Sequence, residues 1–252
     1  MIALDLAPAW MAPYRDAAAR VWARLQAGAT VAQALNDELT ATDIRLTAGP
    51  LRFVPPAEAP RDEAYESFIA RTARVPTRDN LHDLLNGLVW LRHPLVKRRM
   101  NERQADELAR HGVGAQRGAA RDSLTLLDEN GAWLRAPRVL VAALMQRDWH
   151  ALFRTHRAAW RDAELTLVGH ALIEKLAQPR KAITAHVWLV ERDAADDDDV
   201  DAAEAIARRI AGAAAADLAP HAVLPVLGVP GWWPANEDSG FYEDAAVFRP
   251  RR

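Results

Sequence analysis

The chain of 252 residues contains no cysteine. Without thiols it can form no disulfide, and zinc–thiolate sites, iron–sulfur clusters and cysteine nucleophiles are excluded as well. Serine is scarce too: the sequence contains only Ser67, Ser123 and Ser239. None of them stands in a Gly-x-Ser-x-Gly motif, and the sequence has neither a Gly-x-x-x-x-Gly-Lys-Ser/Thr phosphate loop nor a Gly-x-Gly-x-x-Gly fingerprint. These absences argue against a serine hydrolase and against a nucleotide-binding fold.

Long hydrophobic runs are also missing. A helix that crosses a bilayer needs about 20 consecutive apolar residues, whereas the apolar runs here are brief and interrupted by Arg, Asp or Pro. The first residues lack the basic region and long apolar core of a signal peptide. We therefore expect a soluble, cytoplasmic protein that does not enter a membrane.

What the chain does have is hydrophobic residues. They make up 50% of the sequence and include nine tryptophans, which is enough to bury a large core and argues against disorder. The net charge of −2 gives no general attraction to nucleic acid. The charge is uneven, however, because the segment 71–121 holds 11 Lys and Arg against 5 Asp and Glu.

Hydrophobic periodicity predicts a helix-dominated α+β fold in a single domain over 1–252, with short β-hairpins. Helices are expected over 14–27, 30–39, 63–71, 79–92, 94–110, 138–145, 148–157, 170–177 and 201–215. Strands are expected over 44–47, 51–54 and 183–190, and 165–168 is a short apolar run. Thr30 and either Asp79 or Asn80 stand where helix N-caps belong. Asn130-Gly131 between two apolar runs predicts a hairpin over 123–134.

The last segment, 219–252, is rich in Pro, Gly and aromatic residues. Aromatic side chains in an irregular backbone predict a tail wrapped on the domain rather than a free linker. The acidic stretch 193–199 lacks the Gly and the terminal Glu of a calcium loop, so we interpret it as a solvated loop.

The first candidate site lies at the start of the expected helix 79–92. His82 and Asn86 are four residues apart, which places them on one helix face, and Asp83 lies close by. These three side chains could serve as a general base, its orienting partner and a metal or anion contact. The alternative is that His82 and Asp83 are solvated first-turn residues and Asn86 binds backbone. The motif also resembles the helix of His-Asn-His endonucleases, but no histidine precedes His82 to act as their general base.

The second candidate site is a metal-ligand set. His170 and Glu174 share a helix face, and His186 on the expected strand 183–190 could complete a site with two histidines and one carboxylate. Such a set suits a divalent metal such as zinc, manganese or iron and leaves positions open for water and substrate. The alternative is that His170 packs at the start of its helix, Glu174 pairs with a cation, and His186 is a satisfied core histidine.

The third candidate is a basic helix, 92–110, which contains Lys97-Arg98-Arg99. It could contact phosphates of nucleic acid or an acidic partner, or it could be an ordinary solvated helix face.

Several blocks of the sequence resemble a bacterial family of unknown function, domain-of-unknown-function family 3025. The blocks are 74–94, 122–131, 169–176, 183–186, 227–233 and 241–249. They follow one another over most of the chain, and they contain His82, Asn86, His170, Glu174 and His186. The resemblance implies membership of a family with no established activity, and it makes a shared site at these residues more plausible.

Together these patterns predict a metal-assisted, hydrolase-like enzyme in which His170, Glu174 and His186 bind a divalent metal and His82 or Asp83 handles protons, with no further cofactor site. The alternatives are a non-enzymatic binding module built on the helix 92–110 and a structural or regulatory protein. The substrate and the oligomeric state are left open.

Overall fold

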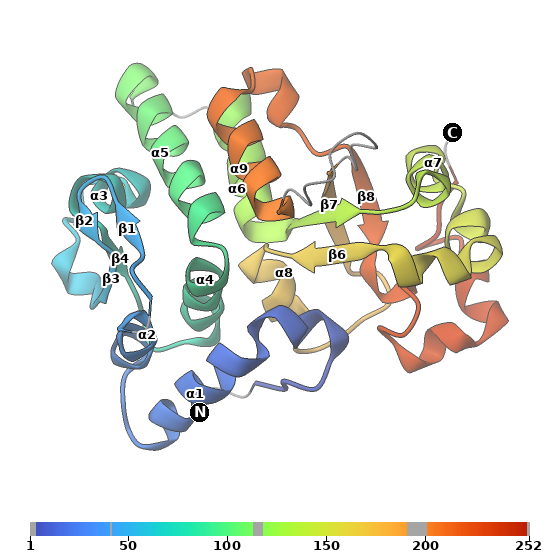
Figure 1. The fold of residues 1–252 in the computed structure, drawn as a ribbon, viewed down its shortest axis with the longest axis horizontal. Coiled ribbons are helices and arrows are strands. Elements are labelled where there is room, and N and C mark those ends of the chain that lie inside the picture. The colour runs from blue at the N-terminus through green and yellow to red at the C-terminus, as the bar shows by residue number, and fades with distance from the viewer. Residues whose placement is uncertain (1–3, 41, 113–117, 191–200, 251–252) are drawn as a thin grey trace. The chain divides into compact units, whose positions relative to one another are not determined.

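The computed structural model describes residues 4–40, 42–112, 118–190 and 201–250. The described residues fall into two compact units. Unit 1 consists of the described residues within 1–7, 11–124 and 207–218. Unit 2 consists of the described residues within 8–10, 125–206 and 219–252. Figure 1 labels the helices and strands. The expectation of a single domain over 1–252 stays a prediction, and the predicted loop 193–199 lies outside the described residues.

Unit 1 is mostly helical, with two small sheets of short strands. Its elements are α1 (Arg15–Gln26), α2 (Val31–Leu39), β1 (Arg45–Leu46), β2 (Gly49–Pro50), β3 (Arg52–Val54), α3 (Tyr65–Thr72), β4 (Arg74–Pro76), α4 (Leu81–Arg92) and α5 (Pro94–His111). In the described residues of this unit, β1 pairs with β2 as an antiparallel hairpin, and β3 pairs with β4 in parallel. Two further helices pass from one unit into the other along the chain, α6 (Ala119–Asn130) and α9 (Ala202–Gly212).

Helix starts in unit 1 follow local capping chemistry. Thr30 caps α2 through a reciprocal capping box with Gln33. The side chain of Asn80 caps α4, because its oxygen accepts the N–H of Asp83 at 2.8 Å. Asp79 has a different partner, since its carboxylate accepts the N–H of Val31 at the first turn of α2, at 2.7 Å. The predicted N-caps at Thr30 and Asn80 are therefore confirmed.

Unit 2 is built on a four-stranded sheet in the order β6-β5-β7-β8. Its elements are β5 (Gly131–Arg135), α7 (Arg138–Gln146), β6 (Glu164–Leu167), α8 (His170–Lys175), β7 (Thr184–Leu189) and β8 (Ala222–Pro225), with short helical turns at Ala151–Thr155, Arg157–Asp162, Val226–Gly228, Pro234–Glu237 and Ser239–Glu243. The central strand β5 is buried at all five positions. It pairs in parallel with β7, and the register sets Gly131 beside His186 and Leu134 beside Leu189. The helix-dominated α+β class with small sheets is confirmed.

The hairpin predicted over 123–134 is wrong. Ala119–Asn130 is the helix α6, and strand β5 begins at Gly131 directly after it. The Asn130-Gly131 pair ends a helix here instead of forming a hairpin turn, and glycine is needed because a Cβ on Gly131 would lie 2.3 Å from the carbonyl oxygen of Leu127. Gly and Asn are favoured both at the C-terminal end of a helix and in a tight hairpin turn, so the Asn-Gly pair alone could not distinguish these two structures.

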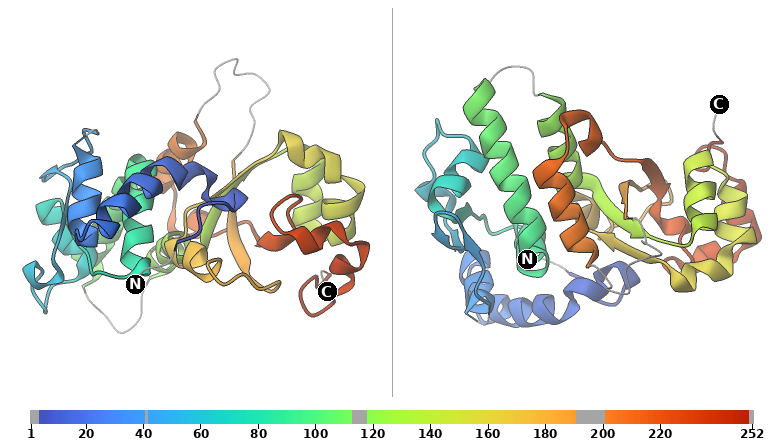
Figure 2. Two further views of the ribbon diagram at one scale, coloured as in Figure 1. Left: turned by 90° about the horizontal axis from the view of Figure 1, so that it is seen from below. Right: turned by 45° about the horizontal axis from the view of Figure 1, so that its top comes forward.

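The C-terminal segment of unit 2 packs on a buried aromatic cluster, as expected for a wrapped tail. The ring of Phe153 stacks on Trp160 and on Tyr242, with centroids 5.9 and 5.3 Å apart, and meets Phe248 edge-on at 5.9 Å. The indole N–H of Trp149 donates to the carbonyl oxygen of Arg249 at 2.7 Å. Both views in Figure 2 show the red C-terminal segment beside the yellow-green segment that carries Trp149 and Phe153. Of the helices in the described ranges, none combines the length and apolar character that crossing a membrane requires.

Candidate metal centre

The end of α6 and the start of α8 are joined by a close backbone contact in unit 2. The N–H groups of Val168 and Gly169 both donate to the carbonyl oxygen of Gly131, at 3.0 and 2.8 Å. A Cβ on Gly169 would lie 2.4 Å from the nitrogen of Gly131 and 2.6 Å from the carbonyl oxygen of Glu129. Only glycine allows this approach, and the next residue of the chain is His170. The contact therefore places the His170 side chain next to the last turn of α6.

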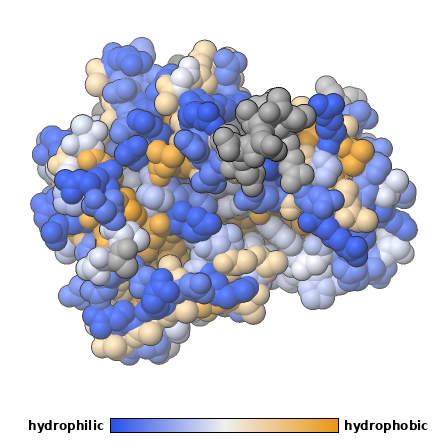
Figure 3. Space-filling model, in the orientation of Figure 1, coloured by the Kyte–Doolittle hydropathy of each residue, from blue (hydrophilic) through white to orange (hydrophobic). Residues whose placement is uncertain are grey.

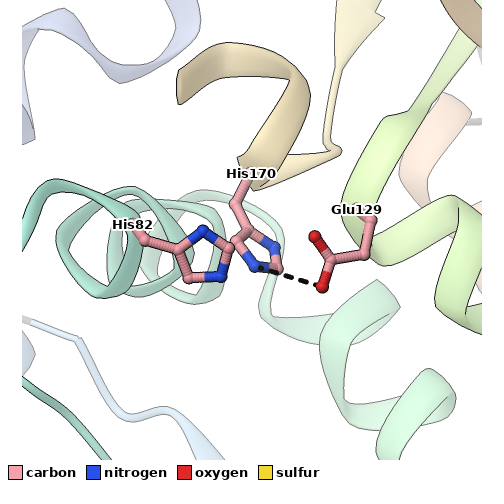
Figure 4. A group of neighbouring side chains, drawn as sticks. All are labelled: His82, Glu129 and His170. Carbon is pink, nitrogen blue, oxygen red and sulfur yellow. Dashed lines mark ion pairs between the residues drawn. The ribbon is translucent and has the colours of Figure 1, made fainter. Parts of the chain in front are cut away.

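His170 lies between two carboxylates of that turn. Its ring is buried, with 4% of the residue exposed. Nδ1 lies 3.9 Å from Asp128 Oδ1, and Nε2 lies 3.9 Å from Glu129 Oε1. The ring of His170 and the carboxylate of Glu129 face each other in Figure 4, where the dashed line marks this pair. Both separations exceed hydrogen-bonding distance. The 3.9 Å between Nε2 and Glu129 Oε1 is slightly longer than the roughly 3.3–3.6 Å that separates two ligand atoms of a tetrahedral site with ion-to-ligand distances of about 2.0–2.2 Å, so a small movement of the side chains would let both bind one ion.

The other two members of the predicted ligand set are placed differently. Glu174 follows His170 by one helical turn on α8 and is partly exposed. His186 lies on β7 beside Gly131, where burial and, to a smaller extent, the positive charge of Lys175 lower the pKa of its imidazole. Within the described ranges, the group of side chains with metal-ligand spacing contains His170 and Glu129 but neither Glu174 nor His186. The set His170, Glu174 and His186 stays a prediction.

The candidate catalytic residues of α4 lie in unit 1. His82 is the second residue of α4, two positions after the N-cap Asn80, and is partly exposed. Asp83 is 7% exposed and accepts from Arg78 at three points: the backbone N–H at 2.6 Å, and the guanidinium nitrogens Nε and Nη2 at 3.0 and 2.9 Å. These bonds give the Asp83 carboxylate a structural use, since it holds the turn before α4. Its catalytic role stays a prediction.

Asn86 is buried in the same unit and bonded on both sides of its amide. Its oxygen accepts from Lys97 Nζ at 2.8 Å, and its nitrogen donates to the Tyr65 hydroxyl at 3.2 Å. Lys97 itself is only 5% exposed, and its ammonium lies 5.3 Å from the centre of the Trp90 ring. Lys97 therefore belongs to the interior of unit 1, and the prediction that it extends a solvated or phosphate-binding surface is wrong.

The remaining cations of the basic helix are largely matched by acids on α5 itself. Arg98 and Arg99 both pair with Glu102, at 3.9 and 2.7 Å, and Arg103 pairs with Glu107 at 3.2 Å. Such pairs one helical turn apart are what a solvated helix surface shows. A contact with nucleic acid or an acidic partner stays a prediction that these pairs do not favour.

Sequence reasoning missed Asp128 and Glu129 as site residues. The predicted hairpin over 123–134 assigns both acids to its turn, where the sequence gives no reason to expect them near His170. The available signal was the acid pair Asp128-Glu129, which precedes Asn130-Gly131 in a block that resembles the family. Their approach to His170 depends on the contact between Gly131 and Gly169, which are 38 positions apart in the sequence.

The fold and these side chains describe an α+β protein with a candidate metal centre at the junction of α6 and α8. Residues 51–252 match the model of DUF3025, a family of proteins of unknown function, and the chain belongs to this family. The resemblance seen in the sequence is thereby confirmed. Comparisons with curated proteins and with solved structures gave no match.

Proposed function

We propose that the protein is a metal-assisted, hydrolase-like enzyme whose divalent ion is bound within unit 2 by His170 and Glu129. The observation that carries the proposal is the position of the His170 ring, which has a carboxylate oxygen 3.9 Å from each of its two nitrogens. A buried imidazole between two acids suits a histidine that binds an ion through one nitrogen and is held through the other.

The two acids would then have different tasks. Glu129 lies on the Nε2 side and is the more exposed, with 38% of its side chain open against 23% for Asp128. It is the better placed to share an ion with His170 that a substrate can also reach. Asp128 lies on the Nδ1 side at 3.9 Å, where its negative charge would favour a proton on Nδ1 and so leave Nε2 for the ion.

The chemistry of the two ligands suits a catalytic ion. Imidazole nitrogen and carboxylate oxygen are both common ligands of catalytic zinc, and such sites leave a position for water or substrate. A bound ion would polarise a carbonyl or phosphoryl oxygen and make a bound water more acidic.

The test is metal binding by the full chain, purified without a histidine tag. Zinc and manganese are measured by elemental analysis and by isothermal titration of the wild type and of conservative variants. We expect one ion per chain, and Glu129→Gln should weaken its affinity at least tenfold. Asp128→Asn should weaken it roughly 10–100-fold, as the loss of a residue that orients a ligand does. Glu174→Gln and His186→Gln are matched controls and should bind like the wild type.

Each contrary result has a definite meaning. No stoichiometric metal after supplementation would make His170 an ion-paired structural histidine and overturn the proposal. Loss of binding in Glu174→Gln and His186→Gln, with Glu129→Gln unchanged, would transfer the site to the set predicted from the sequence. Metal-dependent cleavage of p-nitrophenyl esters or phosphodiesters, abolished by a chelator and in Glu129→Gln, would establish the reaction class.

A further inference from the structure

The ammonium of Lys175 lies at the junction of α6 and α8 in unit 2, where the candidate metal centre is. Lys175 is the last residue of α8, and its Nζ donates to the side-chain oxygen of Asn130 at 2.7 Å. Asn130 directly follows Glu129 in the chain, and its backbone nitrogen lies 2.6 Å from the position that a Cβ on Gly169 would take. This hydrogen bond therefore holds a positive charge beside the backbone contact that sets His170 against α6.

The direction of the Lys175 side chain matters for its role. A lysine in the last turn of a helix is favoured there because it can interact with the carbonyl groups of that helix end. Lys175 stands at this position, but its ammonium reaches across to the neighbouring helix, where it meets a neutral amide oxygen. The amide oxygen takes one of the three N–H groups of the ammonium and does not cancel its charge. The bond thus orients the cation and leaves it a cation.

The charge of Lys175 also acts on β7. His186 on this strand pairs in register with Gly131, the first residue after α6. Burial lowers the pKa of His186, and the positive charge of Lys175 lowers it further. The ammonium is therefore close enough to influence a side chain on the strand beside Gly131, as well as the end of α6.

Both Lys175 and the carboxylate of the centre can be reached from solution. Lys175 is exposed, and 38% of the Glu129 side chain is open, whereas His170 is buried. A substrate therefore needs no opening of the fold to meet the two groups.

Charge is the better basis for recognition at such a site. On the face drawn in Figure 3, hydrophilic side chains predominate and hydrophobic ones form small patches. A lysine ammonium binds phosphate oxygens as a point charge, and a cation that acts on a phosphoryl group together with a metal ion is a common catalytic arrangement. A divalent ion at Glu129 and the ammonium of Lys175 would both attract a negatively charged substrate.

From these observations we propose that the substrate of the metal centre is a phosphate ester, and that Lys175 binds its negatively charged oxygen next to the ion at Glu129 and His170. A neutral carboxylic ester has no such charge, so Lys175 distinguishes the two classes of substrate. Asn130 is a positioning residue, since it acts through the ammonium. The inference rests on the proposed function, because it needs an ion at this centre.

The experiment is a titration of the zinc-loaded full chain with three unreactive probes, followed by the NMR chemical shifts of the protein. Diethyl phosphate carries one negative charge, triethyl phosphate has the same phosphoryl group without a charge, and propanoate carries the charge on a carboxylate. Diethyl phosphate should bind about tenfold more tightly than triethyl phosphate, or better, and more tightly than propanoate. Equal binding of the two phosphates, or tightest binding of propanoate, overturns the proposal.

Variants of Lys175 show whether the preference comes from its charge. In Lys175→Met the Kd for diethyl phosphate should rise about tenfold, while the Kd for triethyl phosphate stays within about twofold. Lys175→Arg keeps the charge and should keep most of the preference. Arg180→Gln removes another exposed cation, five positions further along the chain, and is the matched control that should change neither Kd. A purely structural role of Lys175 would change the two Kd values together.

Zinc titration of the same variants separates this inference from the proposed function. Lys175→Met should bind zinc at least as tightly as the wild type, because a like charge near the ion is removed. If the wild type binds no zinc, the proposed function fails and this inference fails with it. If zinc binds but Lys175→Met keeps the full preference for diethyl phosphate, this inference alone is overturned.

Discussion

Gly169 and Gly131 approach so closely that a Cβ on the first would lie 2.4 Å from the backbone nitrogen of the second. This contact joins the start of α8 to the end of α6, and it sets His170 beside Asp128 and Glu129. The candidate metal centre thus depends on two glycines that carry no chemistry of their own.

The Gly169→Ala variant tests this dependence. The added methyl group would meet backbone atoms of Glu129, Asn130 and Gly131, which cannot rotate away as a side chain can. We expect a loss of about 1–3 kcal/mol in the free energy of unfolding, the usual cost of overpacking, together with weaker metal binding. Urea denaturation and metal titration measure the two effects.

Gly212→Ala is the control for that variant. Gly212 ends α9, and a Cβ there would meet nothing within 4 Å. Alanine in a helix is more stable than glycine by about 0.5–1 kcal/mol, so this variant should be as stable as the wild type or more so. Equal stability of Gly169→Ala and Gly212→Ala would show that the α6–α8 junction tolerates a wider spacing.

The elements that could be predicted from the sequence are those whose signals are local. The capping box of Thr30 and Gln33 and the N-cap of Asn80 act within one turn of helix, so the sequence around them is sufficient. The hairpin over 123–134 failed because Asn-Gly marks a helix end as readily as a tight turn. The choice between them was made by packing, since the backbone at Gly131 lies against Leu127 and Gly169.

The same distinction applies to the site. His170 could be identified as a candidate because it stands in a recognisable block, but its neighbours Asp128 and Glu129 come from a different helix. Helical spacing therefore suggested Glu174, one turn away, in place of carboxylates brought close by a non-local contact. The burial of Lys97 could not be predicted from the sequence either. Lys97 stands in a basic run of the sequence, but in the structure it lies inside unit 1.

A second prediction concerns the start of α4, which carries His82. The Asn80 side chain is the acceptor for the N–H of Asp83. Asn80→Ala should cost about 1 kcal/mol of stability because that N–H loses its cap, whereas Asn80→Asp keeps an accepting oxygen and should cost little. Thermal or urea unfolding of both variants measures the difference. A cost in Asn80→Asp equal to that in Asn80→Ala would mean that the cap contributes nothing.

A third prediction concerns the aromatic cluster under the C-terminal segment. Phe153 is fully buried and contacts the rings of Trp149, Tyr242 and Phe248. Phe153→Ala should lower the free energy of unfolding by about 3–5 kcal/mol, and limited proteolysis should then cut within 219–250 faster. Val139→Ala, at an exposed position of α7, should change stability by less than about 0.5 kcal/mol. Unchanged proteolysis of Phe153→Ala would show that the segment is held by other contacts.

The last prediction concerns acid stability and His93. This residue is 4% exposed and meets the ring of Tyr14 edge-on at 5.8 Å. Burial, aided by the positive charge of Arg92, lowers the pKa of His93 from 6.5 to about 3 in the folded chain. Between these two pH values the unfolded chain takes up a proton that the folded chain does not, so stability falls as the pH falls, by up to about 1.4 kcal/mol per pH unit. His93→Phe keeps a ring against Tyr14 but cannot take up the proton, and its stability should therefore fall less steeply below pH 6.5. Urea unfolding at a series of pH values gives both slopes, and identical slopes would show that His93 is protonated in the folded chain as readily as in the unfolded one.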